Sequence, residues 1–60
     1  MISPRVVIRK RGGEWFWELF TIIPELITSK RFVDCGVQDT WRGAMWEAAH
    51  EWTLYQERWL

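Results

Sequence analysis

The sequence predicts an α+β protein in which three antiparallel strands are followed by one C-terminal helix. Two runs of alternating apolar and polar residues flank a Gly12-Gly13 pair, which indicates a hairpin. A third run is rich in β-branched and aromatic residues. The last twenty residues repeat apolar side chains at steps of three and four, as an amphipathic helix does. Sixty residues of globular composition are expected to form one domain, residues 1–60.

The first two strands are expected at about 5–11 and 14–20. Gly12-Gly13 suits a two-residue turn, whose central residues take positive φ angles. Such a turn pairs Arg11 with Glu14 and fixes every later pair. One face of the hairpin then points toward the core: Val6, Ile8, Trp15, Trp17 and Leu19. The opposite, open face holds Val7, Arg9, Arg11, Glu14, Phe16, Glu18 and Phe20.

The third strand is expected at about 27–35, antiparallel to the second strand. A connector over residues 21–25 precedes it, because Pro24 disfavours a central strand there. Gly36 is expected to end the strand. The sequence pattern does not decide which side chains of this strand point toward the helix. They are either the set Arg31, Val33 and Cys35 or the set around Phe32.

The helix is expected at about 40–59, with Asp39 or Thr40 as its N-cap. One side is apolar and is expected to pack on the sheet: Trp41, Ala44, Met45, Ala48, Trp52, Tyr55 and Trp59. At about 100° per residue, Trp46, His50 and Leu54 project from the opposite side. An indole and a leucine on a solvent-exposed face are unexpected in a monomer.

Six tryptophans are more than so short a chain is expected to bury alone. Each packed aromatic of this size buries roughly 150–250 Å², and a domain of this length buries only about 60% of its unfolded surface. We therefore expect a protein-binding module that self-associates, with a dimer as the first expectation. Two aromatic patches are candidate protein interfaces: Trp46, His50 and Leu54 on the helix, and Phe16 and Phe20 on the open sheet face.

Binding of single-stranded nucleic acid is the alternative function. Arg9, Arg11 and Phe16 share the open sheet face, and aromatic rings among basic groups can stack bases. Glu14 and Glu18 on the same face repel phosphate, and the net charge of the chain is zero. Protein binding is therefore the preferred expectation, because phosphate attraction supplies most non-specific affinity for nucleic acid.

The chain is expected not to be an enzyme. Cys35 and His50 form its only nucleophile–base combination of this kind, and such catalysis needs the two groups within hydrogen-bond reach. We expect them instead at a strand end and on the outer helix face. Glu47, His50 and Glu51 make a poor zinc site, so no catalytic residue, metal or cofactor is expected.

The single cysteine excludes an internal disulfide and favours a reducing, cytoplasmic compartment. No stretch approaches the roughly 20 apolar residues of a membrane span, so no membrane partner is expected. The N-terminal residues lack the apolar core of a signal peptide.

The chain resembles small Trp-rich proteins encoded by actinobacterial phages, most of which have no assigned function. Those proteins often show a Trp-x-Trp strand, then a glycine, a Thr-Trp pair and a helix with paired alanines. The matching residues here are Trp15-Phe16-Trp17, Gly36, Thr40-Trp41 and Ala48-Ala49. The layout is also similar to the N-terminal part of HicB-like antitoxins, in which Gly-x-Thr starts the helix, whereas three residues separate Gly36 from Thr40 here. The phage resemblance implies action on a host protein in the bacterial cytoplasm and assigns no functional residue.

Overall fold

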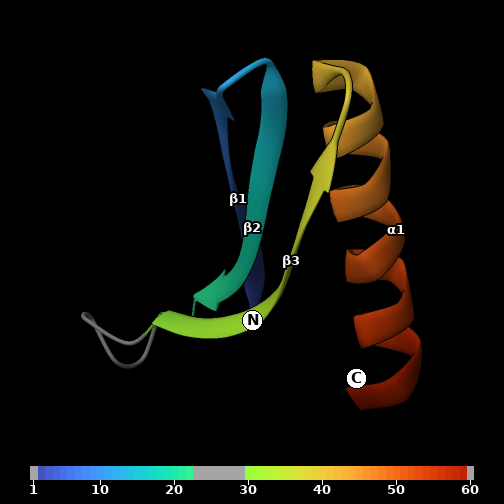
Figure 1. The fold of residues 1–60 in the computed structure, drawn as a ribbon. Helices are drawn as coiled ribbons and strands as arrows, with labels where there is room; N and C mark the ends of the chain where they lie inside the picture. Colours follow the sequence, from blue (N-terminus) through green and yellow to red (C-terminus); the bar gives the residue numbers. More distant parts are fainter. Residues whose placement is uncertain (1, 23–29, 60) are drawn as a thin grey trace.

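Three strands and one helix follow one another in the computed structural model, which describes residues 2–22 and 30–59 (Figure 1). They are β1 (Ser3–Arg11), β2 (Glu14–Ile22), β3 (Lys30–Gln38) and α1 (Trp41–Trp59). Both strand pairs are antiparallel and β2 lies in the centre of the sheet. α1 packs against one face of this sheet. The predicted α+β class and element order are confirmed.

The hairpin of β1 and β2 forms in the predicted register. Arg11 pairs with Glu14, and the pairing continues without interruption to Ser3 and Ile22. The two turn glycines have φ angles of 59° and 83°, as the two-residue turn requires.

The core side of the hairpin is also as predicted. Trp17 is only 2% exposed and Leu19 is fully buried, and the rest of the predicted set packs around them: Val6, Ile8 and Trp15. Each strand extends two residues beyond its predicted outer end. Thr21, expected in the connector, is therefore buried in the sheet, and residues 23–25 of that connector lie outside the described residues.

A β-bulge in β3 changes which of its side chains point inward. Leu19 pairs with Asp34, but the next residue of β2, Phe20, pairs with Phe32, so Val33 is an extra residue in the ladder. Val33 packs on the core, whereas Cys35 pairs with Glu18 on the open face and is exposed. Neither predicted inward set is therefore inward as a whole. Figure 1 shows that the first part of β3 bends away from α1 and the second part runs beside it.

The prediction that Gly36 ends the third strand is wrong, because β3 continues to Gln38. Gly36 lies opposite Trp17 in the ladder. A Cβ atom at Gly36 would lie 2.6 Å from Trp17 Nε1, so the absence of a side chain makes room for the indole. The beginning of the predicted strand, 27–29, lies outside the described residues.

α1 begins and ends within one residue of its predicted bounds. The Gly43 N–H donates to Thr40 Oγ1 at 3.0 Å, which confirms Thr40 as the N-cap. Ala44 and Ala48 are completely buried, and Met45, Trp52 and Tyr55 are half-buried beside them.

The apolar side of α1 is not covered at its two ends. Trp41 and Trp59 are both more than half exposed, contrary to the prediction. For Trp59 the reason is the bend in β3, which withdraws the sheet from the C-terminal half of the helix (Figure 1). Over residues 2–22 and 30–59, no helix has the combination of length and hydropathy that a membrane span needs.

Candidate interaction surfaces

Glu47 has a structural position at the junction of helix and sheet. Trp17 Nε1 donates to Glu47 Oε1 at 2.7 Å, and Gln38 Nε2 donates to Glu47 Oε2 at 2.8 Å. Each carboxylate oxygen therefore accepts a hydrogen bond from a side chain of the sheet. The buried indole N–H of Trp17 needs such an acceptor. From sequence alone, Glu47 is a candidate only as a poor metal ligand, and this structural role has no signal there. Within the part of the chain that the structure describes, no three His, Cys, Asp or Glu side chains group as metal ligands would.

Cys35 and His50 lie on opposite layers of the molecule. Cys35 is exposed on the open face of the sheet, next to Glu18 in the ladder. His50 is exposed on α1, where its ring stacks on Trp46. The core between sheet and helix separates the two side chains, so this arrangement does not assemble a Cys–His pair.

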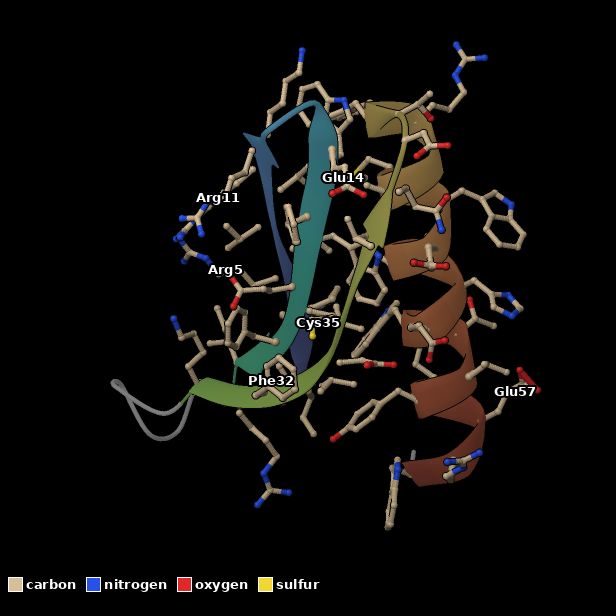
Figure 2. All side chains as sticks on the ribbon, viewed as in Figure 1. Arg5, Arg11, Glu14, Phe32, Cys35 and Glu57 are labelled. Atoms are coloured by element: carbon tan, nitrogen blue, oxygen red, sulfur yellow. The ribbon has the colours of Figure 1, made fainter. Side chains whose placement is uncertain are left out.

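The first candidate surface is the outer helix row, which we define as Trp46, His50 and Leu54. All three side chains are exposed as predicted, Trp46 by 66%. The Trp46 and His50 rings are stacked, with centroids 5.1 Å apart and planes at 9° to each other. Glu57 projects from the same side of α1, away from the sheet (Figure 2). The row thus presents a preformed aromatic surface one helix wide.

The second candidate surface is the open sheet face, which α1 does not cover. Strand alternation places three groups of side chains on it: Arg5, Val7, Arg9 and Arg11 from β1; Glu14, Phe16, Glu18 and Phe20 from β2; and Lys30, Phe32, Cys35 and Val37 from β3. Phe16 and Phe32 are 41% and 53% exposed. Figure 2 shows Arg5 and Arg11 on the β1 side of this face.

The bulge in β3 adds Phe32, an aromatic residue outside the predicted patch, to the open sheet face. Phe32 pairs with Phe20 in the ladder, and their rings meet edge to face with centroids 5.8 Å apart. Lys30 Nζ lies 4.4 Å from the centroid of the Phe20 ring. Of the predicted patch residues, Phe20 is therefore largely covered by its neighbours, and Phe16 and Phe32 are the accessible rings.

Within residues 2–22 and 30–59, hollows open at two places that bear on these surfaces. One of about 560 Å³ lies between β3 at its bend and the C-terminal half of α1, where Phe32, Tyr55 and Trp59 are part of its lining. The other, of about 460 Å³, lies on the open sheet face and includes Arg9, Arg11 and Phe16 in its lining. The three residues predicted for nucleic-acid binding thus surround one hollow.

Comparisons with protein-family models, with curated proteins and with solved structures find no match to this chain. The two surfaces are therefore the basis on which a function can be proposed.

Proposed function

We propose that this chain is a non-enzymatic protein-binding module that associates with a second copy of itself through the outer helix row. The observation that carries the proposal is the exposure of Trp46 in the middle of a regular helix. Exposed apolar patches mark interaction sites, and tryptophan is enriched among residues that dominate interface energies.

The outer helix row suits contact between identical surfaces better than the open sheet face does. The row itself contains no Asp, Glu, Lys or Arg, and Glu57 on the same side of α1 lies beyond its C-terminal end, so two copies packed antiparallel keep their Glu57 carboxylates apart. The open sheet face has four cationic and two anionic side chains, and two such faces would repel each other. The predicted protein contacts of Phe16 and Phe20 are thus less suited to self-association.

The spacing of the row also supports helix-to-helix packing. Trp46, His50 and Leu54 follow one another at steps of four and form a ridge along α1. In a closed dimer the same ridge faces itself across a two-fold axis. The stack between Trp46 and His50 restricts both rings before association, which lowers the entropy lost on binding.

A host protein in the bacterial cytoplasm is the further partner that the phage resemblance implies. Tyr55 and Trp59, which line the hollow at the C-terminal half of α1, project from another side of the helix than Trp46 does. Leu54 lines the hollow and also belongs to the outer helix row, so the two proposed contacts adjoin at that residue. This aromatic hollow is the surface we propose for that second contact.

The test of self-association is the molar mass by light scattering over a range of protein concentrations. We expect twice the monomer mass of 7.3 kDa, falling toward the monomer value on dilution. Trp46→Ala should give a monomer with unchanged circular dichroism.

Trp59→Ala is the matched control. Trp59 is 68% exposed, close to the value for Trp46, but projects from another side of α1 at about 100° per residue. It should leave the dimer intact. A mass of 7.3 kDa at every concentration, or equal dissociation by both substitutions, would contradict the proposal.

A further inference from the structure

We infer that the open sheet face binds single-stranded nucleic acid, with phosphates along β1 and bases on the rings of β2 and β3. This function goes beyond self-association and uses the layer opposite the outer helix row. None of its residues is part of the proposed dimer contact, so either proposal can fail alone.

The register of the sheet places cations beside aromatic rings in two rows of the open face, with the row of Val7, Glu18 and Cys35 between them. Arg9 pairs with Phe16, and Arg5 pairs with Phe20, which pairs in turn with Phe32. Each row therefore runs from a guanidinium on the edge strand to a ring further across the sheet. A single strand of nucleic acid has the complementary layout, because its charge lies along one side and its flat bases project from it.

The spacing along β1 fits a repeating anion. Side chains on one face of a strand recur about every 7 Å, twice the rise per residue. Arg9 and Arg11 are one such step apart, and Arg5 and Arg9 are two steps apart. Phosphates of an extended strand can therefore meet the three arginines, with one step, at Val7, left without a cation.

Two rings are free to stack. Phe16 and Phe32 are 41% and 53% exposed, whereas the Phe20 ring already meets Phe32 and Lys30. Phe16 lies in the hollow of about 460 Å³ that Arg9 and Arg11 also line. A base in this hollow would contact the ring while its phosphate stays beside the arginines.

The charge of the face favours an anionic ligand, since its four cationic side chains exceed its two carboxylates, although Glu14 pairs with Arg11 in the ladder and offsets part of its charge. Glu18 lies in the middle of the open sheet face, on the central strand β2 between Val7 and Cys35. There its carboxylate would meet bases rather than phosphates, and it can accept a hydrogen bond from the amino group of cytosine. An acidic peptide would use the arginines but has no comparable use for two exposed rings. These features together favour nucleic acid over an acidic protein.

The experiment is fluorescence anisotropy with a labelled oligodeoxynucleotide of about 12 nucleotides, within the length that small sheet domains cover. The logarithm of the binding constant should fall with the logarithm of salt concentration at a slope of about −2, because three phosphate contacts contribute about −0.7 each. Arg9→Ala should reduce the magnitude of this slope by about 0.7. Phe16→Ala should weaken binding roughly fivefold or more and leave the slope unchanged.

Arg42→Ala is the matched charge control, because Arg42 is exposed on the first turn of α1. It should leave both affinity and slope unchanged. Phe16→Leu keeps an apolar side chain without the ring, and it should weaken binding as Phe16→Ala does even if the alanine variant folds poorly. Trp46→Ala should retain binding, which separates this outcome from that of self-association.

Three results would overturn the inference. The first is no binding at low salt. The second is an equal loss from Arg9→Ala and Arg42→Ala, which would indicate diffuse attraction. The third is equal competition by polyglutamate together with no effect of Phe16→Leu, which would assign the face to an acidic protein.

Discussion

Gly36 sets the distance between the sheet and the helix by having no side chain. A Cβ atom there would lie 2.6 Å from both Trp17 Nε1 and Glu47 Oε1. Its backbone does not take a positive φ angle, unlike the two turn glycines. The requirement for glycine is therefore one of space, and the hydrogen bond between Trp17 and Glu47 depends on that space.

We expect Gly36→Ala to lower the free energy of unfolding by about 1–3 kcal/mol, the usual range for adding volume to a packed site. Either the indole or the carboxylate must move, which lengthens the bond between them. Urea unfolding followed by tryptophan fluorescence measures the loss. Cys35→Ala is the control, because it changes the exposed neighbour on the opposite face and should stay within about 0.5 kcal/mol. Equal stability of both variants would show that the contact is not tight.

At the scale of elements, Glu47 joins α1 to β2 and β3. It accepts hydrogen bonds from Trp17 of β2 and Gln38 of β3. Glu47→Ala should destabilise the protein by about 1–3 kcal/mol, because the indole N–H of the buried Trp17 loses its acceptor. The measurement is again the midpoint of urea unfolding.

Glu57→Ala is the control that separates the destabilisation caused by losing the Glu47 hydrogen bonds from the effect of the substitution on helix propensity. Both substitutions change the same residue type within α1, so both gain the same propensity, but Glu57 is exposed. It should leave stability unchanged or slightly raised. A variant at Glu47 that is as stable as the one at Glu57 would show that the junction contributes nothing.

The hairpin could be predicted residue by residue because its determinants are local. Gly12-Gly13 specifies the turn, and alternation with period two specifies the faces. β3 could not be predicted in this way. The bulge at Val33 leaves no local signal, and Gly36 resembles a strand end until its neighbour Trp17 is known.

The candidate surfaces likewise include features that local sequence patterns predict and features that only the tertiary structure shows. The outer helix row follows from helical periodicity and is exposed as expected, although the stack of Trp46 on His50 is seen only in the structure. On the sheet, Phe16 and the arginines follow from the hairpin register. Phe32 does not follow from the sequence, because only the bulge brings it beside Phe20.

At the scale of the whole molecule, the sheet and α1 form two layers, and each layer is covered by the other on one face only. Trp17 is buried and Trp15 and Trp52 are half-buried. The other three tryptophans, Trp41, Trp46 and Trp59, are more than half exposed. The helix on the three-stranded sheet thus leaves an outer face on each layer, one carrying the outer helix row and the other cationic and aromatic.

Self-association predicts that thermal stability depends on protein concentration. Because only folded chains associate, Tm should rise as the concentration rises. A tenfold increase adds about 1.4 kcal/mol to the unfolding of a dimer, which corresponds to several degrees for a chain of this size. Calorimetry at several concentrations measures the change.

Trp46→Ala should remove this dependence and leave one Tm at all concentrations, whereas Trp59→Ala should keep it. The scans need a reductant, because Cys35 is exposed and can join two chains by a disulfide. A disulfide-linked pair would unfold at a Tm independent of concentration, so a dependence that persists in reductant identifies non-covalent association. A Tm that does not vary in the unsubstituted protein would mean that the exposed indoles are not shared between copies, and the open sheet face would then remain as the proposed site of function.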